Sequence, residues 1–291
     1  MRAIGYGDRV AKLLDGIPRE GRLIEVGASY APLAPKRMGW QTTVVDHDTH
    51  EVLRRKYADA AVDTDQIEEV DLVWRGGALH DAFDPATHGT FDGLIISHVL
   101  EHLPDPIAFL SSADRLLRPD GVIAVAVPDK RYCFDAYRWP STAGAMLQAH
   151  LEGRTRHAPG VIFDEISLSV TRDGRTLWPP GYGGGPPVFF HSLDRARVLF
   201  DAARDPSADY IDCHAWQFTP ASLELAFLDL AFAGACVWGV SWAEPRANGE
   251  ILAQLRRRDR DLDDPARANL RRAELLRALM REISAGAADL A

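Results

Sequence analysis

The chain has 291 residues, of which 46% are hydrophobic and 26% are charged, and its formal net charge is −9. This composition is typical of an ordinary soluble globular protein, and the acidic charge argues against nucleic acid as the main partner, because phosphate binding needs a basic surface. Three scattered cysteines form neither a disulfide framework nor a metal-binding spacing, and no stretch reads as a signal peptide or a membrane span. We therefore expect a cytoplasmic protein.

Short aliphatic and β-branched runs alternate with segments that carry apolar residues at helical spacing. In chain order, the runs that predict strands are residues 23–26, 42–45, 70–74, 91–97 and 122–127. The segments that predict helices are residues 8–15, a proline-bounded stretch from Ala31, 49–59 and 105–117. Strands that alternate with helices indicate a parallel sheet with right-handed crossovers. The sequence thus predicts an α/β fold with a doubly wound, mostly parallel sheet.

This alternation stops at Pro128 and resumes at Thr219, a helix-cap residue followed by a proline-started helix. The residues in between carry isolated aromatic side chains, arginine-rich patches and a glycine- and proline-rich stretch at 178–187. A connection of this length usually forms a functional lid or binding element. We therefore predict a core made of residues 1–128 and 214–258, with residues 129–213 inserted as a substrate cap.

The C-terminal part predicts two further features. The apolar runs 235–243 and 250–255 predict an antiparallel hairpin that completes the sheet. Residues 259–291 predict a helical tail with one apolar stripe, made of Leu275, Leu276, Leu279, Met280 and Ile283. This stripe has two candidate partners, which are the chain's own core and a second copy of the chain. The second alternative predicts a homodimer through the C-terminal helix.

The stretch from Leu23 to Asp46 reads as strand, turn, helix and strand, and it closes on an acid. Nucleotide-like ligands of open α/β sheets bind at such a turn, where the acid accepts hydrogen bonds from ribose hydroxyls. Together with FDGLIISHVLEHLPDP and LLRPDGVIAVAVPDKRY further along the chain, this stretch resembles the motifs of class I S-adenosylmethionine-dependent methyltransferases, in the same order. The resemblance is to the bacterial branch with a Glu-His pair after the fourth strand.

The resemblance implies a Rossmann-like fold with S-adenosylmethionine as the cofactor. It implies that Glu25 and Gly27 lie against the methionine part and that Asp46 holds the ribose. The other residues expected at the cofactor lie in the same loops or at strand ends, and they are Ala28, Ser29, His47, Gly77 and Ser97. The usual glycine-rich turn has glycine where this chain has Ser29 and Ala31. This departure keeps open a second interpretation, a non-catalytic binding protein that retains the fold.

His98, Glu101 and His102 follow the fourth predicted strand with the spacing H-x-x-E-H. Some zinc proteases use this spacing within a long helix, but here Pro104 follows the motif closely. By resemblance, Glu101 and His102 would line the cofactor pocket. The sequence is also similar to a metal-assisted subset of the family, in which E-x-x-E-H and a later histidine bind a divalent ion. In that case His98 replaces the first glutamate, and His214 or His191 supplies the later ligand. A purely structural role is the third alternative.

Candidate catalytic residues follow the fifth strand and end the insertion. Asp129 and Tyr132 come directly after this strand, where substrate-facing residues are expected. Aromatic side chains close by suit a sugar or another ring-bearing acceptor. A hydroxyl acceptor requires either a metal ion or a base, and the candidate bases are the histidines at positions 98, 102, 191 and 214.

These patterns together predict a methyltransferase that uses S-adenosylmethionine and O-methylates a sugar, a glycan precursor or a secondary metabolite. N-methylation of a small metabolite is the alternative within the class. The expected partner is a small-molecule or glycan acceptor, the second cofactor under consideration is a divalent metal ion, and neither a nucleic-acid partner nor a membrane span is expected.

Overall fold

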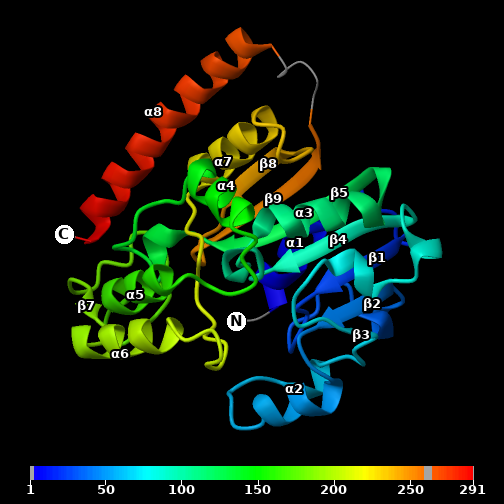
Figure 1. Cartoon of the computed structure of the whole chain (residues 1–291), viewed down its shortest axis with the longest axis horizontal. Helices are drawn as coiled ribbons and strands as arrows, with labels where there is room; N and C mark the ends of the chain where they lie inside the picture. The colour runs from blue at the N-terminus through cyan, green and yellow to red at the C-terminus, as the bar shows by residue number, and fades with distance from the viewer. Residues whose placement is uncertain (1–2, 259–263, 291) are drawn as a thin grey trace.

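The computed structural model describes residues 3–258 and 264–290 (Figure 1). Within these residues a seven-stranded sheet has the order β3-β2-β1-β4-β5-β9-β8. Its strands are β1 (Arg22–Val26), β2 (Gln41–Asp46), β3 (Leu72–Val73), β4 (Phe91–Ser97), β5 (Leu117–Pro128), β8 (Trp238–Pro245) and β9 (Glu250–Arg257). The first five are parallel, whereas β9 runs antiparallel to β5 and to β8. This confirms the predicted Rossmann-like, mostly parallel sheet with a C-terminal antiparallel hairpin.

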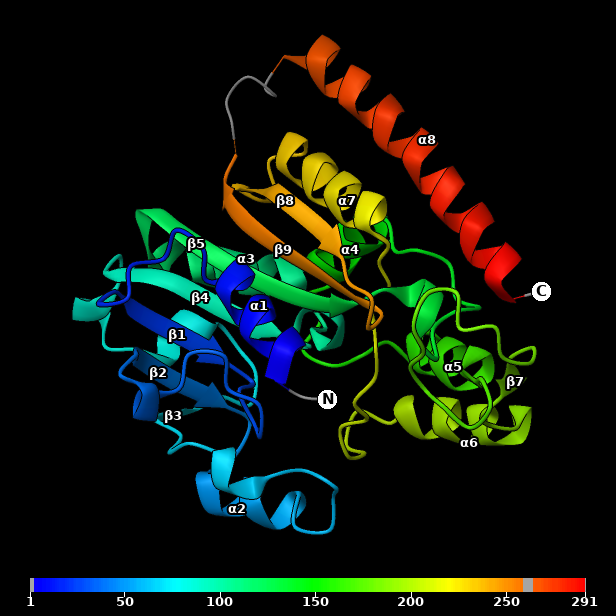
Figure 2. The ribbon, with the colours of Figure 1, turned by 180° about the vertical axis from the view of Figure 1, so that it is seen from behind.

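Helices cover both faces of this sheet (Figures 1 and 2). On one face, α3 (Pro106–Leu116), α4 (Ala143–Leu151) and α7 (Pro220–Phe232) share a core cluster with the strands. On the other face, α1 (Ala3–Leu13) packs on the sheet together with the loop that follows β1. Successive side chains of β1 point to opposite faces of the sheet. Ile24 therefore packs in the first cluster and Leu23 in the second.

The segment after β1 differs from the prediction, because its first ordered turn is the 3₁₀ turn Lys36–Met38 and no α-helix begins near Ala31. Pro32 and Pro35 disfavour helical conformations in the residues that precede them and lack an N–H to donate. The Glu25 carboxylate instead accepts hydrogen bonds from the backbone N–H groups of Leu33, at 2.6 Å, and Ala34, at 3.1 Å. A compact loop therefore covers this face of the sheet.

Helices whose starts carry clear capping signals agree with the prediction. The Asp105 carboxylate caps α3 by accepting the Ala108 N–H at 3.0 Å, and Pro106 occupies the first turn. Thr219 and Ser222 form a capping box at the start of α7. The helix predicted at residues 49–59 is α2 (His50–Lys56). The remaining 3₁₀ turns are Thr64–Gln66, Leu79–Ala82, Pro85–Thr87, Leu100–His102 and Lys130–Tyr132.

The insertion contributes to both the core and a separate lobe. Its first helix, α4, lies in the core cluster through Ala143, Met146 and Ala149. The lobe consists of α5 (Pro159–Leu168), α6 (Leu193–Ala203) and the hairpin of β6 (Val170–Thr171) and β7 (Val188–Phe189). In both views it lies beyond the carboxyl ends of β4 and β5 (Figures 1 and 2). Parallel α/β sheets bind their ligands at this edge.

The C-terminal helix α8 (Pro265–Leu290) packs on its own chain. Leu275 is buried against α7, and Arg271 and Arg272 pair with Glu224 and Asp229 of that helix. Two partners were considered for the apolar stripe, and in the described residues it packs partly on the chain's own core. Leu276 and Met280 of the stripe remain exposed. Across the described ranges, no helix combines the length and apolar character that a membrane crossing would require.

Candidate functional site

The loop after β1 makes a tight turn at the carboxyl edge of the sheet. Gly27 has a φ of 69° and donates its N–H to the Val45 carbonyl at 2.8 Å. A Cβ atom at this position would lie 2.7 Å from Cγ2 of Val99. Both the positive φ and the lack of space require glycine here. The turn therefore brings the backbone of Ala28 and Ser29 next to the end of β2.

Asp46 ends β2 as a buried carboxylate beside this turn. It accepts the Ser29 N–H at 3.1 Å and the His47 N–H at 2.8 Å, and the His47 Nδ1 lies 2.6 Å away. Ser29 Oγ and Trp74 Nε1 are buried polar atoms without a hydrogen-bond partner in the described part of the chain. Buried polar groups normally have partners, so this edge retains unused capacity to bind a polar ligand.

The other residues predicted at the cofactor have varied surroundings. Both carboxylate oxygens of Glu25 already bind the loop after β1, and burial raises its pKa to about 7 although the two N–H groups oppose the shift. Ala28 is buried, and Gly77 has a φ of 78° with open space around it. Ser97 Oγ accepts a hydrogen bond from Arg9 at 2.8 Å. Glu25 thus fixes the shape of the loop after β1. Asp46, at the end of β2, binds the start of the same loop through the Ser29 N–H.

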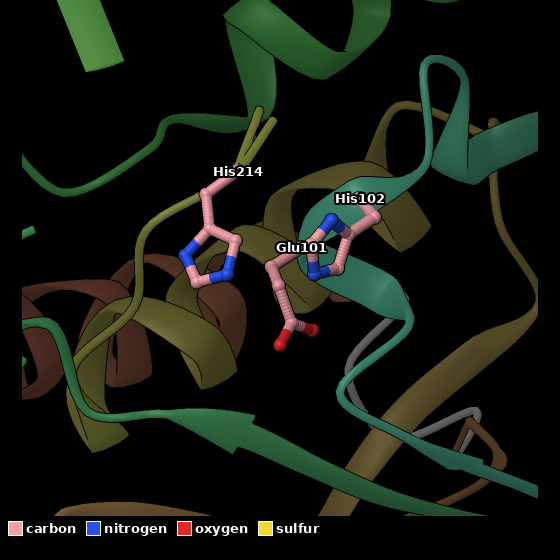
Figure 3. A group of neighbouring side chains, drawn as sticks. All are labelled: Glu101, His102 and His214. Atoms are coloured by element: carbon pink, nitrogen blue, oxygen red, sulfur yellow. The ribbon is translucent and has the colours of Figure 1, made fainter. Parts of the chain in front are cut away.

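Glu101, His102 and His214 form a compact group at the end of β4 (Figure 3). Their potential ligand atoms all lie within 4.8 Å of one another. Glu101 and His102 belong to the turn Leu100–His102, and His214 comes from the segment before α7. The Ala215 N–H donates to the Glu101 carbonyl at 2.6 Å and fixes the two segments together. The structure therefore brings together three of the four residues predicted to bind a metal.

Glu101 is a buried carboxylate with only 1% of its surface exposed. Neither of its oxygens has a hydrogen-bond partner within the described residues, although Nδ1 of His98 lies 3.3 Å from Oε1. Burial alone would raise its pKa, but the imidazoles of His98, His214 and His102 outweigh this effect and lower it. Glu101 is thus held as a buried carboxylate that pairs with His98 and accepts no hydrogen bond from the described residues.

Each histidine of this group is oriented by a carboxylate. Asp135 Oδ2 lies 2.6 Å from Nδ1 of His214, and Asp212 Oδ1 lies 3.1 Å from Nδ1 of His102. Donation from Nδ1–H leaves the lone pair of Nε2 free to bind an acid, a substrate or a metal. Asp135 and Asp212 were missed by the sequence analysis. They lie in the insertion, where no periodic pattern or motif distinguishes them from other acids.

His98 has a different environment. Its Nε2 lies 2.7 Å from Glu250 Oε1, and Arg9 pairs with the same carboxylate at 2.9 Å. Burial would lower the pKa of His98, but the nearby carboxylates of Glu101 and Glu250 outweigh this effect and raise the pKa to about 9. A protonated imidazole has no lone pair for a proton or a metal. This arrangement favours an ion-pair role over the base and metal-ligand roles predicted for His98.

The remaining candidates lie outside the Glu101 group. His191 is next to the β7 hairpin, where its ring centroid lies 4.3 Å from that of Phe190. Asp129 is buried, caps the turn Lys130–Tyr132 and pairs with Arg131. The Tyr132 carbonyl accepts the Trp178 N–H at 2.9 Å. Both residues after β5 therefore have structural partners at the base of the insertion.

His157 is a buried histidine next to Asp212. Its Nε2 accepts the Tyr210 hydroxyl at 2.8 Å, and its Nδ1 is buried without a partner in the described ranges. Burial lowers the pKa of His157 to about 4. The folded chain therefore keeps this ring neutral under mildly acidic conditions, in which the unfolded chain protonates it at its ordinary pKa of about 6.5.

This difference predicts acid sensitivity of the fold. Because protons bind the unfolded state more tightly between about pH 6.5 and pH 4, stability is lost as the pH falls through this window. The contribution of His157 to the free energy of unfolding should decrease by about 2 kcal/mol between pH 7 and pH 5. Urea unfolding of the wild type and of His157→Gln at both pH values measures this change. Equal losses in the two proteins would contradict the assignment.

Residues 2–168, more than half of the chain, match a family described as "Methyltransferase domain". No curated protein matches the chain.

Among solved structures, the 1,6-didemethyltoxoflavin-N1-methyltransferase of Burkholderia thailandensis, bound to 1,6-didemethyltoxoflavin and S-adenosylhomocysteine, is 14% identical over 87% of this chain and 78% of that one, with a TM-score of 0.42. The CcbJ methyltransferase of Streptomyces caelestis is 12% identical over 87% of this chain and 95% of that one, with a TM-score of 0.43. A SAM-dependent methyltransferase of Aquifex aeolicus is 11% identical over 86% of this chain and 88% of that one, with a TM-score of 0.40.

The family match agrees with the strand order of the sheet and with the turn at Gly27 beside Asp46. S-adenosylmethionine, the cofactor predicted from the sequence, is the methyl donor of this class of proteins. The chain belongs to the methyltransferase domain family.

Proposed function

We propose that this chain transfers a methyl group from S-adenosylmethionine to a hydroxyl of a small acceptor, namely a sugar, a glycan precursor or a secondary metabolite. The observation that carries the proposal is the group of Glu101, His102 and His214 at the carboxyl end of β4. It lies on the same sheet edge as the Gly27 turn and Asp46, and β1 pairs with β4. A deprotonating group is thus available at the edge where cofactors of this fold bind.

The donor set fits a divalent ion. Glu101 offers a buried carboxylate that pairs with His98 but accepts no hydrogen bond within the described part of the chain, and His102 and His214 each have Nδ1 held by an acid. Two imidazoles and one carboxylate are a common set of protein ligands for catalytic zinc and similar ions. When bound, such an ion supplies Lewis acidity that lowers the pKa of an acceptor hydroxyl.

The residues of the chain would perform three tasks in this reaction. Asp46 and Ser29 would hold the ribose side of the cofactor. His102 and His214 would orient the acceptor oxygen toward the methyl group, because methyl transfer depends mainly on in-line alignment. The insertion, residues 129–213, would act as the cap that excludes water. Phe134 supports this role, since its ring packs on His214 with centroids 4.6 Å apart.

Experiments can distinguish this proposal from two alternatives, which are N-methylation and a non-catalytic role. An amine acceptor that is neutral at the assay pH would not need a base, so N-methylation predicts activity that survives loss of the Glu101 group. A non-catalytic protein that retains the fold predicts no turnover with any acceptor. Titration with S-adenosylmethionine, followed by product analysis with hydroxyl-bearing and amine-bearing acceptors, separates the three cases.

Removal of metal ions is expected to abolish turnover. Thorough treatment with a chelator should leave S-adenosylmethionine binding intact, because Asp46 and Ser29 do not belong to the donor set. Addition of a divalent ion should restore activity. Methyl transfer before chelation, after it and after ion addition gives the answer, together with elemental analysis. Full activity in a metal-free protein would instead support His102 or His214 as a general base.

A further inference from the structure

Asp135 is a buried carboxylate that binds His214 from the start of the insertion. Only 2% of Asp135 and 7% of His214 is exposed. Oδ2 of Asp135 lies 2.6 Å from Nδ1 of His214, and Oδ1 accepts a hydrogen bond from Nη1 of Arg138 at 2.8 Å. The same Arg138 nitrogen donates to the His214 carbonyl at 2.6 Å. The two carboxylate oxygens thus bind different residues, and Arg138 holds both members of the pair.

The charge of Asp135 determines where the hydrogen of its contact with His214 lies. The guanidinium of Arg138 carries a permanent charge and has only 5% of its side chain exposed, so it keeps the neighbouring carboxyl group ionised. An ionised carboxylate can only accept hydrogen bonds. The hydrogen between Asp135 and His214 must therefore lie on Nδ1. In the neutral ring, the lone pair is then on Nε2.

The His214 ring presents Nε2 to the Glu101 group. In Figure 3 this nitrogen lies on the side of Glu101 and His102, whereas Nδ1, which binds Asp135, lies on the far side. The ring is packed between two others, with its centroid 4.6 Å from that of Phe134 and 4.7 Å from that of His102. It therefore has little room to turn, and its lone pair is directed at the proposed acceptor site.

The corresponding pair of His102 is much more open. Asp212 Oδ1 lies 3.1 Å from Nδ1 of His102, and 62% of the Asp212 side chain is exposed. Water can compete for such a carboxylate, and no arginine binds it within the described ranges. His214 is therefore the histidine of the group whose hydrogen is held more firmly.

We infer that Asp135 is a positioning residue for methyl transfer, which fixes the hydrogen of His214 on Nδ1 and directs the Nε2 lone pair to the acceptor site. Its role in the reaction rests on the proposed function, in which this lone pair takes the acceptor proton or holds an ion. The insertion would thus do more than cover the site, because it would also set the chemical state of one of the histidines.

Arg138 makes this arrangement specific for aspartate. In Asp135→Asn, Arg138 can bind only the amide oxygen, because a guanidinium donates and does not accept. The NH₂ group of the amide would then face Nδ1 of His214 and donate to it. The hydrogen of the neutral ring would have to move to Nε2, and the lone pair would be lost from the acceptor site. A change of very similar shape therefore has a defined chemical result.

Nitrogen-15 NMR of the full-length, chelator-treated chain with labelled histidine reports the position of this hydrogen and does not depend on turnover. His214→Gln identifies the His214 signals by their loss. At a pH where the ring is neutral, we expect the hydrogen on Nδ1 in the wild type and on Nε2 in Asp135→Asn. The matched change beside His102, Asp212→Asn, should leave the His214 hydrogen on Nδ1.

Kinetic measurements test the role in the reaction. Asp135→Asn should lower kcat for a hydroxyl acceptor by about a hundredfold or more, while the Kd of S-adenosylmethionine stays unchanged. The control is Asp164→Asn, which makes the same change at an exposed acid of α5 and should retain full activity.

The outcomes separate this role of Asp135 from the proposed function. A wild-type ring with hydrogen on Nε2, alone or together with Nδ1, would overturn the inference, as would a hydrogen that stays on Nδ1 in Asp135→Asn. Wild-type kcat despite a moved hydrogen would overturn the positioning role. The expected tautomers in a chain that methylates no hydroxyl acceptor would overturn the proposed function alone. If Asp135→Asn does not fold, Asp135→Glu retains a carboxylate and should keep the hydrogen on Nδ1, and its loss from Nδ1 would contradict the inference.

Discussion

Replacing Glu101 with glutamine should reduce methyl transfer to a hydroxyl acceptor by about two to four orders of magnitude. The amide has nearly the same shape as the carboxylate, so the buried turn Leu100–His102 can retain its packing. It lacks the negative charge that complements His102 and His214, and it offers one acceptor oxygen instead of two. The loss should therefore appear in kcat, measured at saturating S-adenosylmethionine.

The control for this experiment is Glu69→Gln, since the Glu69 side chain is 77% exposed. This variant should retain full activity. S-adenosylmethionine affinity of Glu101→Gln, measured by calorimetry, should stay within about threefold of the wild type, and thermal unfolding should show an intact fold. Unchanged turnover in Glu101→Gln would refute a chemical role for the group and would favour its interpretation as pocket lining.

Replacing Asp46 with alanine should weaken S-adenosylmethionine by about 1.5–3 kcal/mol, which is roughly a 10- to 150-fold rise in Kd. The carboxylate is expected to accept hydrogen bonds from the ribose, and it also holds the Ser29 N–H in the turn. Loss of these two interactions should weaken binding of the cofactor and leave binding of the acceptor unchanged. Calorimetric titration with S-adenosylmethionine is the direct measurement.

Two further variants make this result specific. Asp59→Ala removes an exposed acid shortly after α2 and should leave the Kd unchanged. Asp46→Asn preserves the shape but loses the charge, so it should give an intermediate Kd. If Asp46→Ala binds the cofactor as tightly as the wild type, the ribose assignment is wrong.

Local signals account for the parts of the fold that were predicted correctly. The run Phe91–Ser97 is apolar enough to read as a buried strand, and β4 has these same bounds. Asp105 and Thr219 are capping residues with a proline at the next position, and both start helices. In each case the deciding interactions lie within a few residues of one another. Such interactions can be read from the sequence alone.

Long-range contacts explain the helix that was predicted wrongly and the surroundings of site residues that the sequence did not reveal. The proline-bounded stretch after Ala31 looks helical in isolation, but Glu25 binds its backbone N–H groups and holds it as a loop. His98 reads as a metal ligand in H-x-x-E-H, yet Glu250, distant in the sequence, pairs with it. Asp135 and Asp212 meet the two histidines only once the insertion has folded. No sequence spacing encodes these encounters.

The end of α8 has a consequence for the insertion. Asp289 pairs with Arg172 at 3.0 Å and accepts the Gly181 N–H at 3.2 Å, while Gly286 packs on the side chain of Arg131. The final turn of a 26-residue helix thus fastens the glycine- and proline-rich stretch of the insertion. Trimming the chain at its C-terminal end would release this stretch. The position of this stretch therefore depends on an acid about a hundred residues further along the chain.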